Sequence, residues 1–132
     1  LDHCKTINDR FGHAIGDAAL RVFADTANTN MRASDIVARY GGEEFVAILP
    51  GTTKAEAMKL AERLRETIER DTTALLSNGM DHTITVSIGV SSFPDDADDK
   101  DKLIFCADGA LYEAKRAGKN RVRMYRKPVA HK

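Results

Sequence analysis

The stretch IVARYGGEEFVAIL, residues 36–49, decides the fold class of this chain. Its two ends, residues 36–40 and 45–49, are short runs rich in β-forming side chains, and the four residues between them begin with Gly41 and Gly42. Two glycines between two such runs predict a hairpin turn that joins two strands. The stretch therefore predicts an antiparallel pair of strands in the fold.

Helical periodicity extends outward from this hairpin on both sides. Apolar residues recur every three or four positions in residues 17–32, 54–70 and 102–117, which predicts three amphipathic helices. We expect Asp17 to lie at the start of the first helix, and Thr52 or Thr53 to cap the second.

Two further strands are predicted in the second half of the chain, after a loop over residues 71–81. In residues 83–90 apolar side chains alternate with Thr, Ser and Gly, which is typical of a half-buried strand, and residues 120–125 predict a last strand. Strands and helices mix without regular strand–helix–strand alternation. We therefore expect an α+β fold in which helices pack on one antiparallel-rich sheet, near the ferredoxin-like plan.

The composition limits the functions open to the chain. Its 132 residues, 42% hydrophobic and 30% charged, predict one globular domain. Twenty basic and twenty acidic side chains give no net charge, which argues against binding of long nucleic acid. A small phosphorylated ligand needs only a few local donors and is not excluded. No apolar run approaches the roughly 18 residues of a membrane span, so no membrane contact is expected of this domain.

Two cysteines, Cys4 and Cys106, lie far apart in the sequence and form no zinc-binding pattern. No other mark of a secreted protein accompanies them. A reduced setting therefore suits them better than a disulfide, and we expect a cytoplasmic domain.

One candidate site is the segment from Asn8 to Asp17, which is dense in Asn, Asp and Gly and precedes the first predicted helix. Such a segment forms turns through hydrogen bonds from side chains to the nearby backbone. It could also form a polar pocket, because an amide and a carboxylate together can bind the edge of guanine. The spacing alone leaves both interpretations open.

A second candidate is the turn itself, where Glu43 and Glu44 follow the two glycines. It could be a plain turn with two solvated acids. Adjacent carboxylates at a tight tip repel one another, however, and this repulsion is relieved when a cation binds between them. Mg²⁺ prefers carboxylate and carbonyl oxygens and is usually shared with substrate phosphates. These residues are therefore consistent with either a plain turn or a Mg²⁺ site.

Basic residues supply the remaining candidates. Arg32 and Asp35 lie at the end of the first predicted helix, where Arg32 could complement the helix dipole beside a turn at Asp35, or the pair could bind a phosphate and a guanine edge. Lys115 and Lys119 lie four positions apart near the end of the third predicted helix, where they could complement the helix dipole or bind a phosphate group.

Four motifs occur in order along the chain: DxxKxxNDxxGHxxGD at 2–17, RYGGEEF at 39–45, TVSIGV at 85–90 and ADxALYxAKxxGxN at 107–120. Together they resemble the GGDEF domain, the diguanylate cyclase family, over about residues 1–125. The resemblance implies a fold of the nucleotidyl-cyclase type. It also implies a bacterial signalling enzyme that condenses two GTP into cyclic di-GMP and two pyrophosphates. Two domains would meet as a homodimer of half-sites.

The resemblance also implies roles for single residues. Glu43 would bind Mg²⁺ or Mn²⁺ and assist the attacking 3′-hydroxyl, with Glu44 and the backbone carbonyl of Leu1 as further metal ligands. Lys115 and Lys119 would contact the GTP phosphates as catalytic residues. The substrate-binding residues would be Asn8 and Asp17 at guanine, the backbone amides of Cys4 and Lys5 at phosphate, and Gly41 and Gly42 against the nucleotide. Arg32, Asp35 and Arg63 would form an inhibitory site for cyclic di-GMP.

The sequence departs from the family pattern in three places. Asp2 matches the second Asp of the family's Asp-x-Asp, so the first, a metal ligand, would precede Leu1, and the domain looks truncated within its first strand. Cys4 replaces a Phe, and Lys119 replaces what is often an Arg, which loses the bidentate fork. The alternative is a non-catalytic sensor that binds cyclic di-GMP or GTP, which would not require the intact Glu43–Glu44 pair. In either case we expect an upstream sensory or regulatory domain, through which this domain could be tethered to a membrane receptor.

Overall fold

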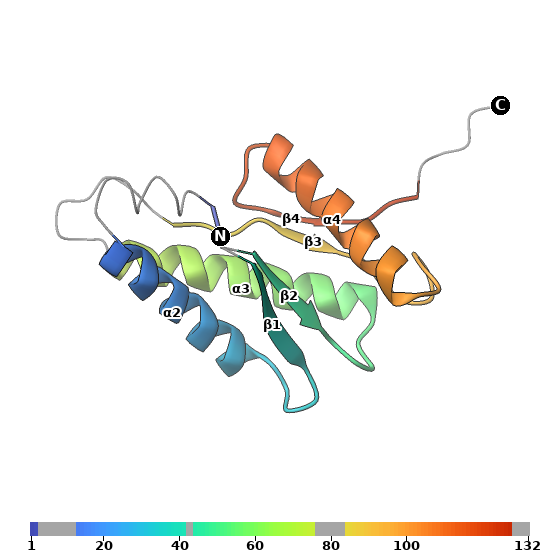
Figure 1. Cartoon of the computed structure of the whole chain (residues 1–132), viewed down its shortest axis with the longest axis horizontal. Coiled ribbons are helices and arrows are strands. Elements are labelled where there is room, and N and C mark those ends of the chain that lie inside the picture. Colours follow the sequence, from blue (N-terminus) through green and yellow to red (C-terminus); the bar gives the residue numbers. More distant parts are fainter. Residues whose placement is uncertain (3–12, 42–43, 76–83, 128–132) are drawn as a thin grey trace.

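The computed structural model describes residues 1–2, 13–41, 44–75 and 84–127 (Figure 1). These residues form the predicted α+β fold. The helices are α2 (His13–Asn30), α3 (Lys54–Leu75) and α4 (Lys100–Arg116), and the strands are β1 (Ile36–Gly41), β2 (Glu44–Ile48), β3 (Ile88–Val90) and β4 (Val122–Met124). The three predicted helices and the hairpin are confirmed.

The helix boundaries differ from those predicted. α2 begins at His13, so Asp17 lies one turn inside the helix and does not cap it. α3 continues to Leu75, so the first five residues of the predicted loop 71–81 are helical. Once a helix is nucleated, each further residue adds a hydrogen bond at little extra entropic cost, which explains why polar residues extend it beyond its apolar pattern.

The described strands form two separate pairs instead of one antiparallel-rich sheet. β1 and β2 pair antiparallel, with Ile36 opposite Ile48 and an irregularity between Arg39 and Gly41. β3 and β4 pair parallel. The connection between β3 and β4 contains the whole of α4, and a crossover of that kind is what parallel neighbours require. The prediction missed this strand–helix–strand unit.

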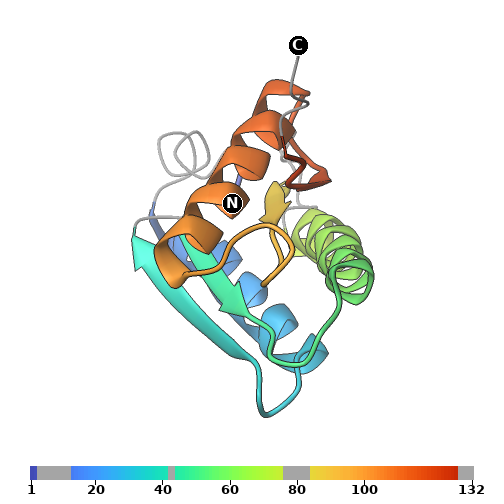
Figure 2. The same cartoon turned by 90° about the vertical axis from the view of Figure 1, so that its right-hand side faces the viewer.

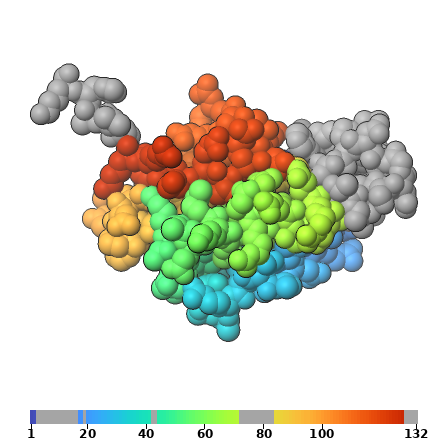
Figure 3. Space-filling view, turned by 180° about the vertical axis from the view of Figure 1, so that it is seen from behind, coloured from blue at the N-terminus to red at the C-terminus, as the bar shows by residue number. Residues whose placement is uncertain are grey.

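The core lies between the helices. β3 and β4 lie between α3 and α4 (Figures 1 and 2), and α2 packs along α3. Figure 3 shows α3 on the back of the molecule, with the C-terminal segment beside it. One core cluster joins α2, α3 and the segment before β3 through Phe23, Ala27, Leu64, Ile68 and Val86.

The segment before β3 is buried on both faces, so the prediction of a half-buried strand was wrong. Ile84 and Val86 are buried, and so are Thr85 and Ser87 on the polar side of the alternation. α4 covers the same side further along, where a Cβ atom on Gly89 would overlap the Ala107 carbonyl and the Leu111 amide. Glycine is needed there because the backbone of α4 comes so close.

Local capping fixes the starts of two helices. The Glu56 amide donates to Thr53 Oγ1 at 3.2 Å and the Thr53 amide donates to Glu56 Oε1 at 3.3 Å, which is a capping box at the start of α3. Thr53 is therefore the cap. Asp99 caps α4 by accepting the Lys102 amide at 2.8 Å. None of the helices within the described residues is long and apolar enough to span a membrane.

Candidate functional site

The hairpin presents one predicted metal ligand at the surface. Glu44 opens β2 opposite Gly41, and both are exposed. The next residue, Phe45, packs into the core, where its ring centroid lies 4.3 Å from that of Phe23 on α2. This aromatic contact, together with the pairing to β1, ties the strand that carries Glu44 to the core. Gly42 and Glu43, which are also predicted site residues, lie outside the described residues.

The chain start lies on the same core cluster as the hairpin. Leu1 and Phe45 both pack against it, so the predicted carbonyl ligand and the strand of Glu44 share one support. A carboxylate and a backbone carbonyl are hard oxygen donors, and their chemistry fits Mg²⁺. Within the described residues no group of three or more His, Cys, Asp and Glu side chains is placed to hold a metal. The Glu44 carboxylate and the Leu1 carbonyl, both predicted metal ligands, are oxygen donors of the kind that Mg²⁺ prefers.

The predicted nucleotide-binding segment is described only at its end. Asp17 is exposed in the second turn of α2 and is therefore accessible to a ligand. Asn8, Cys4 and Lys5 lie outside the described residues. Cys106 is a free, buried cysteine.

Asp2 is the most heavily bonded carboxylate among the described residues. Its side chain accepts the Thr85 hydroxyl at 2.8 Å, the Ser87 hydroxyl at 2.8 and 2.9 Å, and the Asn120 backbone amide at 3.1 Å. Its own amide donates to the Thr85 carbonyl at 2.8 Å. Burial alone would raise the pKa of Asp2, but the hydrogen bonds from the two hydroxyls and the amide outweigh it and hold that pKa below its ordinary value.

The predicted phosphate-contacting lysines lie around the turn after α4. Lys115 is exposed in the last turn of the helix. Lys119 has a left-handed backbone (φ 64°), as do its neighbours Gly118 (φ 125°) and Asn120 (φ 48°). The Lys119 amide donates to the Ala114 carbonyl at 3.0 Å, which ties this turn to the helix end.

Side chains of α3 hold the same turn from the other side. Arg65 donates to Asn120 Oδ1 at 2.9 Å, and Asn120 Nδ2 donates to Glu69. Arg65 also binds Glu62, and this hydrogen-bonded pair raises the pKa of Arg65 and lowers that of Glu62. The sequence reasoning missed this network and the role of Asp2. The available signal was the hydroxyl residues Thr85 and Ser87, which alternate with apolar residues in the predicted strand 83–90.

Two of the three residues predicted to bind product, Arg32 and Asp35, lie together just after α2. Asp35 Oδ2 accepts the Arg32 amide at 2.9 Å, and the Asp35 side chain is only 2% exposed. Its other oxygen, Oδ1, is buried and has no hydrogen-bond partner among the described residues. The Arg32 guanidinium donates to the Pro50 carbonyl at 3.2 Å and to Thr52 Oγ1, and is itself largely exposed.

Arg63 lies on α3, whose start faces Arg32. Glu56 in the first turn has its pKa lowered by hydrogen bonds from Thr53, with a smaller contribution from the charge of Arg32. Arg63 is exposed and follows Glu56 by seven residues, which is two turns and about 10 Å along the same face of the helix.

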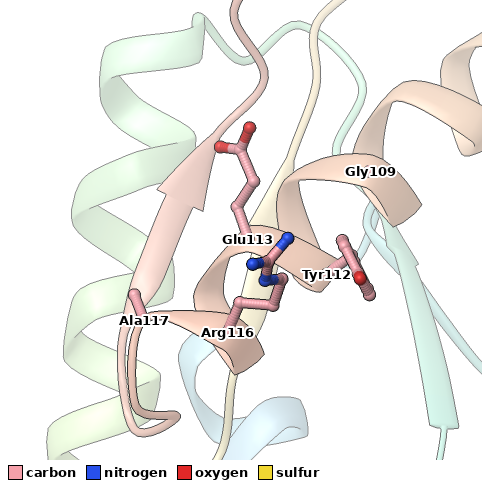
Figure 4. Close-up of a pocket in the computed structure, with 5 residues that line it drawn as sticks. All are labelled: Gly109, Tyr112, Glu113, Arg116 and Ala117. Carbon is pink, nitrogen blue, oxygen red and sulfur yellow. The ribbon is translucent and has the colours of Figure 1, made fainter.

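A separate hollow lies on the outer side of α4 (Figure 4). It has a volume of about 470 Å³ and is lined by Gly109, Tyr112, Glu113, Arg116 and Ala117. The Arg116 guanidinium lies 5.8 Å from the centroid of the Tyr112 ring. In the part of the chain that the structure describes, none of the predicted site residues lines this hollow.

Sequence comparison relates the chain to known proteins. Residues 1–121 match the family described as "Diguanylate cyclase, GGDEF domain". Response regulator PleD of Caulobacter vibrioides is 43% identical over 122 residues, which cover 92% of this chain and 27% of that protein. Diguanylate cyclase A of Treponema denticola is 42% identical over 122 residues, which cover 92% of this chain and 32% of that protein. The chain thus spans about a third or less of the length of these relatives.

Solved structures show the same architecture. The active GGEEF domain of a diguanylate cyclase from Vibrio cholerae matches with a TM-score of 0.80 and 31% identity, covering 96% of this chain and 79% of that one. The GGDEF domain of DgcB from Caulobacter crescentus, in complex with c-di-GMP, matches with a TM-score of 0.77 and 32% identity. That match covers 93% of this chain and 72% of the other.

Proposed function

Because the chain belongs to the GGDEF domain family of diguanylate cyclases, we propose that it condenses two GTP molecules into cyclic di-GMP. The observation that carries the proposal is the hairpin, which anchors Phe45 in the core and presents Glu44 at the surface, on a cluster that also holds Leu1. Each domain binds one GTP, and two domains meet as a homodimer. The substrate is a cytoplasmic nucleotide, so the domain acts in the cytoplasm, under the control of an upstream sensory or regulatory domain.

The reaction joins the two nucleotides twice. The 3′-oxygen of one GTP attacks the α-phosphorus of the other, the bond to pyrophosphate breaks, and Glu43 assists removal of the hydroxyl proton. Glu43, Glu44 and the Leu1 carbonyl hold Mg²⁺ or Mn²⁺, which when bound neutralises charge on the phosphates. Lys115 and Lys119 contact the phosphates from the end of α4 and the turn after it. These residues work by charge and position, without a covalent intermediate.

The remaining predicted residues bind the nucleotide. Asp17 and Asn8 bind the guanine edge, since a carboxylate accepts hydrogen bonds from both the ring N–H and the exocyclic amine. The backbone amides of Cys4 and Lys5 bind phosphate. Gly41 and Gly42 let the hairpin backbone approach the nucleotide closely.

A test of the catalytic proposal compares Glu43→Gln with the matched variant Glu66→Gln in the full-length protein that carries this domain. Glu66 is an exposed acid on α3, outside the proposed site. Both proteins are incubated with GTP and Mg²⁺ at high concentration and the nucleotides are separated. We expect cyclic di-GMP from wild type and Glu66→Gln and none from Glu43→Gln. No product from wild type, while a control cyclase is active, would refute the cyclase proposal.

Cyclic di-GMP also binds away from the proposed active site, at Arg32, Asp35 and Arg63. The buried, unpartnered Oδ1 of Asp35 supports this, because a buried acceptor without a partner is costly unless a ligand donates to it. Arg32 supplies an exposed cation beside it, and Arg63 a second contact from α3. Product held there opposes the encounter of the two half-sites.

The same observation favours the second candidate function, a non-catalytic sensor of cyclic di-GMP. Calorimetry with cyclic di-GMP on wild type, Arg32→Ala and the control Arg70→Ala tests the binding site, since Arg70 is an exposed arginine elsewhere on α3. We expect only Arg32→Ala to lose affinity. Binding without any turnover of GTP would establish the sensor in place of the enzyme, and equal affinity in all three proteins would dispose of this site.

A further inference from the structure

Asp2 is a buried carboxylate whose hydrogen bonds reach two parts of the proposed site. The residue is 3% exposed, and its two oxygens accept bonds from Thr85, Ser87 and the Asn120 amide. A carboxylate is buried at a cost unless such donors surround it. Leu1 precedes Asp2 in the chain, and Lys119 precedes Asn120. Each end of the network therefore lies next to a residue proposed to bind metal or phosphate.

The turn that carries Lys119 needs external support. Lys119 and Asn120 both have left-handed backbones, with φ values of 64° and 48°, although neither is a glycine. Such conformations persist only where the surroundings hold them. Asp2 binds the main chain of Asn120, while Arg65 and Glu69 bind its side chain. Of these three partners, only Asp2 also belongs to the segment that carries Leu1.

We propose that Asp2 is a positioning residue that fixes the Lys119 turn relative to the chain start, so that the phosphate-binding lysine and the Leu1 carbonyl face one nucleotide. The inference rests on the proposed function of Lys119 and Leu1. Asp2 touches neither substrate nor metal. It acts through the Asn120 amide on one side and through its own bridge to Thr85 on the other.

The primary test replaces Asp2 by Asn, which keeps the size of the side chain but removes its charge. Two readouts are measured on the full-length protein: hydrogen exchange of the Asn120 amide, and affinity for 3′-deoxy-GTP with Mg²⁺. This nucleotide lacks the attacking hydroxyl and reports binding without turnover. A hydrogen bond to a charged group contributes about tenfold in an equilibrium. We expect Asn120 exchange to rise and nucleotide affinity to fall, each by about tenfold.

Two further variants separate positioning from general stability. Ser87→Ala removes one hydroxyl from Asp2 and keeps the charge, and it should give the same two changes at smaller size. The control Ser91→Ala removes a hydroxyl bond of 2.7 Å to the Leu103 carbonyl, in the same layer but away from the turn. It should lower the melting temperature comparably and leave nucleotide affinity within about twofold.

The outcomes are distinct from those of the cyclase test. Unchanged Asn120 exchange or affinity in Asp2→Asn would overturn the inference, and so would an equal loss of affinity in Ser91→Ala. Absence of 3′-deoxy-GTP binding in wild type would overturn both the inference and the nucleotide site. A third outcome is that wild type binds 3′-deoxy-GTP but makes no cyclic di-GMP, and that Asp2→Asn lowers the affinity. That result would refute the cyclase proposal and support the positioning role of Asp2.

Discussion

The hairpin and the turn after α4 carry two parts of the proposed site, and they are held in opposite ways. The hairpin pairs residues close in sequence, lies largely at the surface and is tied to the core through Phe45. The turn is held by Asp2, which lies 118 positions from Asn120 in the sequence, and by side chains of α3. The hairpin is specified by residues close in sequence, whereas the turn adds long-range, partly buried polar contacts to its local bond with the end of α4. Substitutions should therefore affect the two independently.

The largest expected effect is that of Gly89→Ala, which removes the close packing of α4 on β3, directly after the segment that carries Thr85 and Ser87. A methyl group there would overlap backbone atoms of Ala107 and Leu111, which cannot move aside as a side chain can. We expect the free energy of unfolding to fall by about 3 kcal/mol or more, measured by urea denaturation.

The matched control is Gly109→Ala, on the outer side of α4. A Cβ atom there meets nothing within 4 Å, so the variant should be neutral or gain up to about 1 kcal/mol from helix propensity. Equal stability of the two variants would show that α4 does not pack against Gly89 in the way described.

Phe45→Ala tests the hairpin side of the comparison. Phe45 is half-buried and contacts the ring of Phe23, so its removal should lower the free energy of unfolding by about 2–3 kcal/mol. Tyr40→Ala is the control on the same hairpin, because Tyr40 is 66% exposed and should change stability by about 0.5 kcal/mol or less. A similar loss in both would mean that the hairpin is not anchored through Phe45.

The features that could be predicted from the sequence are those held by local contacts, and the features that could not are those held by long-range contacts. Periodicity and turn residues predicted the hairpin, the three helices and a cap at Thr52 or Thr53, because these depend on near neighbours in the sequence. The parallel pairing of β3 with β4 and the burial of Thr85 and Ser87 depend on what α4 and Asp2 bring from far along the chain, and no local pattern encodes that. Glu44 and Arg32 were chosen from motifs, whereas Asp2 and Asn120 were assigned no site role from the residues alone.

Thr85→Val isolates one bond of the long-range part. Valine keeps the shape of threonine but removes the hydroxyl that donates to Asp2 at 2.8 Å. With one donor lost to a buried carboxylate, we expect a loss of about 1.5–2 kcal/mol in the free energy of unfolding. The control Thr67→Val removes a hydroxyl that binds only the Arg63 carbonyl of its own helix, and should cost about 0.5 kcal/mol or less. Equal costs would mean that the Asp2 network adds no stability.

The smallest expected effect is that of a substitution in the helix cap of α3, which lies outside the proposed site. Thr53→Ala removes the hydroxyl of the capping box at the start of α3, which should cost about 1 kcal/mol. Thr29→Ala is its control, because that hydroxyl binds the Asp25 carbonyl within α2 and alanine improves helix propensity. The Asp2–Asn120 bond lies outside this cap, so Thr53→Ala should leave Asn120 hydrogen exchange unchanged while the melting temperature falls. Faster Asn120 exchange in this variant would mean that the two regions are coupled through α3, since Arg65 and Glu69 on that helix also bind Asn120.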